Sequence, residues 1–201
     1  MARLWGVDGS AAMLARAQPH PRITWMQQDL RDWRAEVPAD LLFSNAALQW
    51  LPDHACLFPA LLASLAAGGI LAVQMPCNFQ EPSHRLMAAT ALEGPWRARL
   101  EGLIRTAPVG KPSFYHALLA PQADSIDIWQ TRYLHVLEGA DPVKEWTKGT
   151  WLKPLLDALQ EPQRAAFEAD YAARVRAAYP PQPDGHTLFE FNRLFLVARK
   201  R

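Results

Sequence analysis

Residues 40–54 read Asp-Leu-Leu-Phe-Ser-Asn-Ala-Ala-Leu-Gln-Trp-Leu-Pro-Asp-His, a stretch in which a short apolar run ends abruptly in polar and aromatic residues. Similar apolar runs occupy residues 4–7, 23–26 and 70–74. None of these runs alternates between apolar and polar side chains, and continuous apolar runs are typical of parallel strands buried on both faces. Helices or loops separate them, including a helix expected at 57–65 and closed by Gly68-Gly69. The pattern therefore predicts an α/β fold.

The second half of the chain is expected to be mainly helical before it ends in a strand. Three helices are predicted, at 83–105 with a break at Gly94-Pro95, at 143–159 and at 163–178. Within the last of these, apolar side chains recur every four residues and predict a face that packs against the core, made of Phe167, Tyr171 and Val175. Residues 106–121 are rich in Pro, Gly and aromatic residues and are expected to form a loop. Strands are predicted at 126–137 and 187–199.

Composition excludes several classes of function. The 21 basic and 20 acidic residues give a net charge of +1, and no basic cluster indicates a nucleic-acid partner. No apolar run approaches the roughly 20 residues of a membrane span, and the first residues do not resemble a signal peptide. Cys56 and Cys77 match no redox or metal spacing, so a reducing cytoplasmic compartment is expected. The six histidines show no metal-ligand spacing, and no metal is expected.

Three predicted strands end in a side chain suited to binding a polar ligand. In open α/β sheets, ligands bind at the carboxyl ends of the strands. Asp8 has the geometry to accept hydrogen bonds from both hydroxyls of a ribose, although a helix cap or a turn would also explain it. Asp29 is suited to accept from an exocyclic amine such as that of adenine, or to end a turn. Asn45 begins a dense polar and aromatic patch, or is a structural residue beside a core Trp50.

Taken together, these motifs resemble class I S-adenosylmethionine-dependent methyltransferases. The segments concerned are Gly-Val-Asp-Gly-Ser-Ala-Ala-Met-Leu at 6–14, Gln-Asp-Leu at 28–30 and Ser-Asn-Ala-Ala-Leu-Gln-Trp-Leu-Pro-Asp-His at 44–54. Further segments narrow the resemblance to the trans-aconitate 2-methyltransferase family: Leu-Ala-Val-Gln-Met-Pro at 71–76 with Asn78, Asp-Ile-Trp at 127–129 and Arg-Leu-Phe-Leu-Val-Ala at 193–198. The resemblance runs from about residue 4 to the end of the chain.

The resemblance implies a Rossmann-like α/β sheet with a helical substrate cap inserted and an antiparallel strand at the C-terminus. The whole chain, residues 1–201, would then be one domain, with residues 79–124 and 140–183 as the cap segments. S-adenosylmethionine is the implied cofactor. The residues implied to bind it are Asp8 and Gly9 at the ribose, Asp29 and Leu30 at the adenine, and Asn45 and Ala46 at the methionine end.

The family's acceptor is a tricarboxylic acid, which sets the expected acceptor site. Gln49 and Trp50 would form the wall between cofactor and acceptor. Arg193 would pair with a carboxylate, because guanidinium binds carboxylate through two hydrogen bonds. Tyr115 matches a family tyrosine pair in part, and His116 stands where an acidic residue is expected, which leaves the acceptor preference open. A carboxylate is already ionised at neutral pH, so the residues only position the reactants and no general base is expected.

One departure from the family pattern concerns the start of the chain. The family opens with a strand that ends in a glycine-rich loop, Asp-Leu-Gly-Cys-Gly-x-Gly, and no such segment occurs in this sequence. We therefore expect an incomplete sheet whose two central strand edges pair with each other or are exposed. A misplaced start site, a shortened chain and gene decay all remain open.

The expected function is methyl transfer to a carboxylate of a small polycarboxylic acid such as trans-aconitate. The alternatives are a catalytically inactive methyltransferase-like module and a methyltransferase for another small molecule. A monomer or a weak homodimer is expected.

Overall fold

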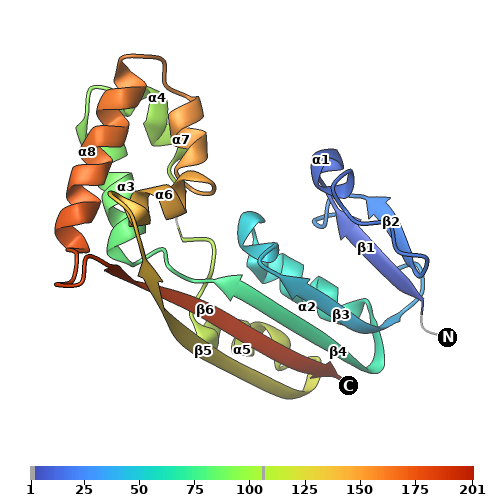
Figure 1. Cartoon of the computed structure of the whole chain (residues 1–201). Helices are drawn as coiled ribbons and strands as arrows, with labels where there is room; N and C mark the ends of the chain where they lie inside the picture. The colour runs from blue at the N-terminus through green and yellow to red at the C-terminus, as the bar shows by residue number, and fades with distance from the viewer. Residues whose placement is uncertain (1–2, 106) are drawn as a thin grey trace.

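The computed structural model describes residues 3–105 and 107–201 and places six strands in two sheets (Figure 1). In the first sheet, β1 (Leu4–Asp8) and β2 (Ile23–Gln27) are parallel. The second sheet has the order β3-β4-β6-β5 and contains β3 (Ala39–Asn45), β4 (Leu65–Pro76), β6 (Thr187–Lys200) and β5 (Ala123–Leu137). β3 and β4 are parallel, whereas β6 runs antiparallel to both of its neighbours. The predicted α/β fold and its antiparallel C-terminal strand are confirmed.

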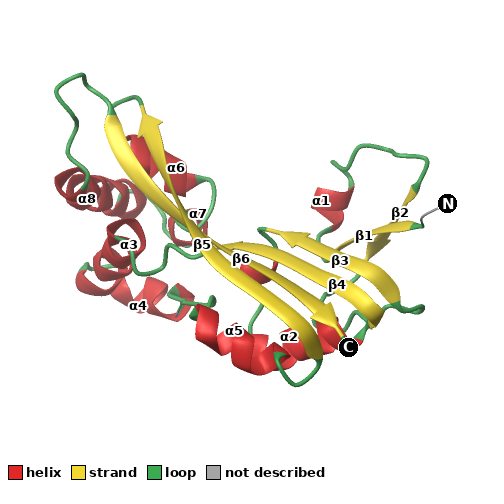
Figure 2. Ribbon diagram, turned by 90° about the horizontal axis from the view of Figure 1, so that it is seen from below, coloured by secondary structure: helices red, strands yellow, loops and turns green. Residues whose placement is uncertain are grey.

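One face of the four-stranded sheet is covered by two helices, α2 (His54–Ala63) and α5 (Pro112–Leu119), which lie side by side on it (Figure 2). The first hydrophobic core lies between these helices and the sheet. Its strand residues alternate along the chain, because successive side chains of a strand point to opposite faces. They are Leu71, Val73, Met75, Leu194, Leu196 and Ala198. The opposite face carries exposed apolar side chains, with Phe43 of β3 71% exposed and Trp129 of β5 42% exposed.

The second core lies among the helices that gather at the other end of the molecule from β1 and β2 (Figure 1). These helices are α3 (Pro82–Glu93), α4 (Arg97–Leu100), α6 (Pro142–Lys148), α7 (Lys153–Asp157) and α8 (Gln163–Ala178). The predicted core face of α8 is confirmed, since Phe167, Tyr171 and Val175 are all buried in this core. None of the helices in residues 3–105 and 107–201 has the length and apolar character needed to cross a bilayer.

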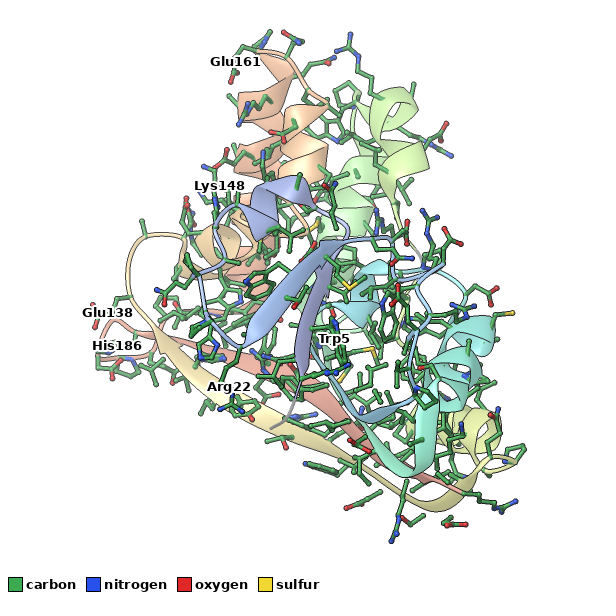
Figure 3. The ribbon with its side chains drawn as sticks, turned by 90° about the vertical axis from the view of Figure 1, so that its right-hand side faces the viewer. Trp5, Arg22, Glu138, Lys148, Glu161 and His186 are labelled. Atoms are coloured by element: carbon green, nitrogen blue, oxygen red, sulfur yellow. The ribbon has the colours of Figure 1, made fainter. Side chains whose placement is uncertain are left out.

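Three short elements complete the chain. They are α1 (Ala11–Leu14) and the 3-10 turns η1 (Leu48–Trp50) and η2 (Glu101–Leu103). The β5–β6 pair ends next to the helices of the second core. At this end, His186 lies 3.5 Å from the Glu138 carboxylate, and both side chains are seen together in Figure 3. Trp5 of β1 lies on the side of the molecule that faces the viewer in the same figure.

The expected loop at 106–121 is wrong, because residues 112–119 form helix α5. Pro112 occupies the first turn of this helix, where a missing N–H costs nothing. Tyr115 and Leu119, four residues apart, are its buried residues. The predicted helix at 143–159 is also interrupted, since α6 ends at Lys148 and α7 begins only at Lys153.

The glycine pair at 68–69 does not close a helix as expected. Helix α2 ends earlier, at Ala63, and the hydroxyl of the following Ser64 donates to the Leu61 carbonyl oxygen. The pair lies inside β4, where the register with β3 shifts, and Gly68 adopts a φ of +76° that favours glycine. The strand is therefore longer than its apolar run predicts.

The edges of β1 and β3 do not pair with each other. Among the described residues, β1 is bonded only to β2 and β3 only to β4, so the strands fall into two sheets. Exposed apolar side chains mark both strands, with Trp5 of β1 48% exposed and Leu41 of β3 58% exposed. Of the two outcomes expected from the sequence, exposure of the edges is the one observed.

Candidate functional site

The carboxyl ends of β1 and β2 meet, which brings two of the predicted ligand residues into one corner. The backbone N–H of Gln28 donates to the Asp8 carbonyl oxygen at 3.1 Å, and a Cβ built on Gly9 would lie 3.8 Å from the Gln28 carbonyl oxygen. The Asp8 carboxylate accepts from the Ser10 N–H through Oδ1 at 2.8 Å. Ser10, and not Asp8, caps α1, because its hydroxyl accepts from the N–H of Met13. Asp8 is thus a turn residue with a second carboxylate oxygen that makes no hydrogen bond within the described residues.

Asp29 forms a local fork with Arg31. The Arg31 Nε lies 3.0 Å from both carboxylate oxygens, and the Arg31 backbone N–H donates to Oδ1 at 2.9 Å. The side-chain hydrogen bond from Arg31 is the largest of the effects that lower the pKa of Asp29 to about 2. The carboxylate is therefore ionised over the whole physiological range. The neighbouring Leu30 packs against the first core, which fixes this turn to the body of the protein.

The end of β3 is held in a sharp turn by backbone and amide hydrogen bonds. Ala46 has a φ of +53°, a left-handed conformation that is uncommon for a residue with a side chain. Its N–H donates to the Gln74 carbonyl oxygen at 2.9 Å, and its own carbonyl oxygen accepts from Gln49 Nε2 at 2.7 Å. Strained backbone that surrounding bonds hold in place tends to occur at functional sites. Here the strained residue, Ala46, directly follows Asn45, which is predicted to bind the cofactor.

Two buried amide atoms at this edge of the sheet have no hydrogen-bond partner among the described residues. They are Gln49 Oε1 and Gln74 Nε2, in side chains that are 3% and 6% exposed. Buried polar atoms are nearly always paired, so unpaired ones call for a ligand, an ion or a water molecule. Together with Asn45, they fit the polar methionine end of an S-adenosylmethionine molecule. The residues present at this edge are therefore compatible with the cofactor.

Arg193 lies on the same face of the sheet as Asn45. Strand pairing sets Asn45 opposite Gln74, Gln74 opposite Phe195, and Phe195 opposite Trp129, so these four side chains form one row across the sheet. Arg193, two residues before Phe195, shares this face and donates from Nη1 to Gln74 Oε1 at 2.9 Å. We call Asn45, Ala46, Gln49, Gln74 and Arg193 the strand-end cluster.

Aromatic rings hold the Arg193 guanidinium in this position. Its Cζ atom lies 5.0 Å from the ring centroid of Phe191 and 5.8 Å from that of Tyr133. Such cation–π contacts orient a guanidinium without neutralising its charge. Among the described residues Arg193 has no carboxylate partner, so its charge is available to an anionic ligand.

The structure does not bring Tyr115 and His116 to the strand-end cluster. Both belong to α5, which packs on the face of the sheet opposite Arg193. Tyr115 is fully buried, and its hydroxyl accepts from the Gly110 N–H at 3.1 Å and bonds His54 Nδ1 at 2.7 Å. His116 is an exposed residue of the same helix. Their placement gives no support to direct contact with an acceptor.

Two residues near the candidate site were missed from the sequence. Gln74 ends the fourth apolar run, as Asp8, Asp29 and Asn45 end the others, and this position could have marked it. Trp151 stacks on Trp50 with ring centroids 4.4 Å apart and an interplanar angle of 18°. No local sequence pattern predicts this contact, because the two rings are 101 residues apart in the chain.

The described residues contain no group of three or more His, Cys, Asp and Glu side chains that could hold a metal ion.

Comparison with known proteins places the chain among methyltransferases. No protein-family model matches the chain. It is 52% identical over 198 residues to the trans-aconitate 2-methyltransferase of Azoarcus sp. (strain BH72), a match that covers 98% of this chain and 78% of that protein. The protein of the same description from Yersinia pestis (strain Pestoides F) is 45% identical over 199 residues, which cover 98% of this chain and 77% of that protein.

The fold is shared with a solved methyltransferase. Phosphoethanolamine N-methyltransferase 2 of Haemonchus contortus, solved in complex with phosphomonomethylethanolamine and S-adenosylhomocysteine, superposes with a TM-score of 0.54 at 16% identity, over 98% of this chain and 43% of that one. The fold is thus that of the S-adenosylmethionine-dependent methyltransferases. The level and extent of the sequence identity then define the family: the chain belongs to the trans-aconitate 2-methyltransferase family. The resemblance inferred from the sequence is confirmed.

Proposed function

We propose that this protein transfers a methyl group from S-adenosylmethionine to a carboxylate of a small polycarboxylic acid of the trans-aconitate type. The observation that carries the proposal is the strand-end cluster, in which the Gln74 amide, with its unpaired Nε2, is bonded to a guanidinium that has no carboxylate partner among the described residues. The names of the two relatives support the substrate class. When bound, the cofactor supplies a methyl group activated by a sulfonium.

The cofactor residues follow from their places at the strand ends. Asp8 and Gly9 hold the ribose, because Asp8 retains a free carboxylate oxygen in an open turn. Asp29 and Leu30 border the adenine. Asn45 and Ala46 hold the methionine end, next to the unpaired amide atoms of the strand-end cluster.

The acceptor residues position one carboxylate oxygen for attack. Arg193 pairs with a second carboxylate of the acceptor, and Gln49 and Trp50 form the wall beside the reacting groups. The helical segments 79–124 and 140–183 act as the cap, although α5, inside the first of them, lies on the sheet. The attacking oxygen is ionised at neutral pH, so catalysis rests on alignment and on exclusion of water. S-adenosylmethionine held by Asp8, Asp29 and Asn45 would supply the methyl group to that oxygen and would keep the electron pair of the broken carbon–sulfur bond on sulfur.

Two measurements on the 201-residue chain test the proposal. Calorimetry with S-adenosylmethionine should show binding, and incubation with labelled cofactor and trans-aconitate should give a labelled methyl ester. Binding without transfer to trans-aconitate, but with transfer to another small molecule, would assign a different acceptor. Absence of binding would favour the catalytically inactive module and contradict the proposal.

A cytoplasmic location and a monomer or weak homodimer belong to the same proposal. The two free cysteines, Cys56 and Cys77, fit a reducing compartment. Cell fractionation and sedimentation equilibrium measure location and assembly, and a stable higher oligomer would contradict the expected state.

A further inference from the structure

A cavity of about 480 Å³ lies between α3, residues 103–105 with Ala107, and the start of α7, outside the strand-end cluster. Its volume is within the range of pockets that bind small ligands. The described side chains that define its chemistry are Phe79, His84, Arg85, Arg105 and Trp151. Aromatic rings and aliphatic side chains form most of the wall, and the charged groups are both guanidinium groups. We call it the Arg85–Arg105 pocket.

The charge of this pocket is entirely positive among the described residues. None of the residues that line it is Asp or Glu, and neither Arg85 nor Arg105 forms an ion pair with a described carboxylate. Arginines elsewhere on the surface do have acidic partners: on α8, Arg174 and Arg176 both pair with acidic side chains. Two guanidinium groups that share a concave surface without counter-charges favour an anionic ligand with more than one carboxylate.

Arg105 is held against the aromatic wall of the pocket. Its Nη1 donates to the Trp50 carbonyl oxygen at 3.4 Å, and its Cζ lies 5.8 Å from the centroid of the Trp151 ring. These contacts fix the side chain at the pocket and leave most of its N–H donors free.

His84 contributes a polar but uncharged group. Burial lowers its pKa to about 4, so the imidazole is neutral at physiological pH. Its Nδ1 lies 3.2 Å from the Ser83 hydroxyl, and its ring packs edge-on against Phe79. The positive charge of the pocket thus comes from the two arginines alone.

One aromatic stack connects the pocket to the candidate active site. Trp151, which lines it, stacks on Trp50, and Trp50 ends the turn that follows Asn45 of β3. The stacked pair Trp151 and Trp50 therefore connects this pocket to the turn at the strand end where the proposed cofactor site lies.

From this geometry we propose that the Arg85–Arg105 pocket binds the carboxylate group of the polycarboxylic acceptor that is neither methylated nor paired with Arg193. The inference rests on the proposed function and extends it, because it assigns the acceptor a binding surface on the cap helices in addition to Arg193. Arg85 and Arg105 each bind a carboxylate oxygen, Trp151 and Phe79 pack against the carbon skeleton, and His84 completes the polar surface.

Direct binding to the full chain tests this proposal without any cofactor. Trans-aconitate is titrated into the protein by calorimetry, with the fluorescence of the tryptophans as a second signal and the monocarboxylate crotonate as a comparison. Arg85→Gln and Arg105→Gln should each raise the Kd for trans-aconitate roughly tenfold or more, as expected for loss of a charge-assisted hydrogen bond. Arg99→Gln, an exposed arginine of α4 outside the pocket, is the matched control and should leave the Kd unchanged.

The outcomes separate this inference from the proposed function. An unchanged Kd in both pocket variants, or no binding of trans-aconitate by the wild-type chain, overturns the pocket. Methyl transfer by the wild type with a KM unaffected by Arg85→Gln and Arg105→Gln leaves the function standing and removes the pocket. Binding that depends on both arginines in a protein that transfers no methyl group would support the pocket and contradict the function. Because both side chains are exposed, the glutamine variants should retain the fold, which thermal unfolding checks.

Discussion

Tyr115→Phe is the substitution for which the structure and the sequence predict different results. In the structure the Tyr115 hydroxyl joins two groups: it accepts from the Gly110 N–H at 3.1 Å and donates to His54 Nδ1 at 2.7 Å. The His54 Nε2 donates to the Leu48 carbonyl oxygen at 2.9 Å, so the ring proton is on Nε2. The Nδ1 atom of the neutral ring therefore accepts, and the Tyr115 hydroxyl donates to it. Burial lowers the pKa of His54, which keeps the imidazole neutral and Nδ1 an acceptor.

Removal of this hydroxyl leaves two partners unpaired, the buried His54 and the half-buried Gly110 N–H. A buried donor or acceptor without a partner costs about 1–3 kcal/mol, so with Gly110 only half-buried the expected loss is about 2–4 kcal/mol in the free energy of unfolding. Urea unfolding followed by circular dichroism measures it. Tyr133→Phe is the control, because Tyr133 is 40% exposed.

A loss below about 0.5 kcal/mol would refute the structural argument, since one unpaired buried group alone should exceed that value. The sequence-based hypothesis of direct acceptor contact predicts another pattern. Tyr115→Phe would then raise the KM for the acceptor and leave stability close to that of the wild type. That result would place Tyr115 in the acceptor site.

Further predictions concern pH, the acceptor and backbone packing. The pKa of His84 falls from 6.5 to about 4 on folding, so its contribution to stability is present above pH 6.5 and is lost as the pH falls towards 4. His84→Gln should remove about 3 kcal/mol of that pH dependence in urea unfolding, with His116→Gln as the control. An unchanged dependence of stability on pH in His84→Gln would contradict the reasoning. Arg193→Ala should raise the acceptor KM roughly tenfold or more in a methyl-transfer assay, and an unchanged KM would remove Arg193 from the site. Gly69→Ala places a methyl group 2.9 Å from two backbone oxygens and should lower the unfolding free energy by about 1–3 kcal/mol. Gly149→Ala, with nothing within 4 Å, should not, and equal effects would refute the packing argument.

The sequence alone determined the features that depend on neighbouring residues in the chain. A continuous apolar run predicts a strand, and the polar residue at its end is visible in the same few positions, as at Asp8 and Asn45. Burial of these strands on both faces, which the apolar runs also predict, is wrong, because β1 and β3 carry exposed apolar side chains. The stripe on α8 is equally local, because residues four apart share one helix face. For these reasons the α/β class, the strand ends and the family were all accessible from the sequence.

Only the tertiary structure decided which of the candidate residues meet. Arg193 and Tyr115 both have side chains suited to a carboxylate, yet one lies on the open face of the sheet and the other lies in the core beneath α5. The stack of Trp151 on Trp50 depends on how the cap helices pack, and that packing follows from the burial of the second core as a whole. Side-chain chemistry is a property of single residues, whereas proximity between distant residues is set by the sum of packing interactions across the fold.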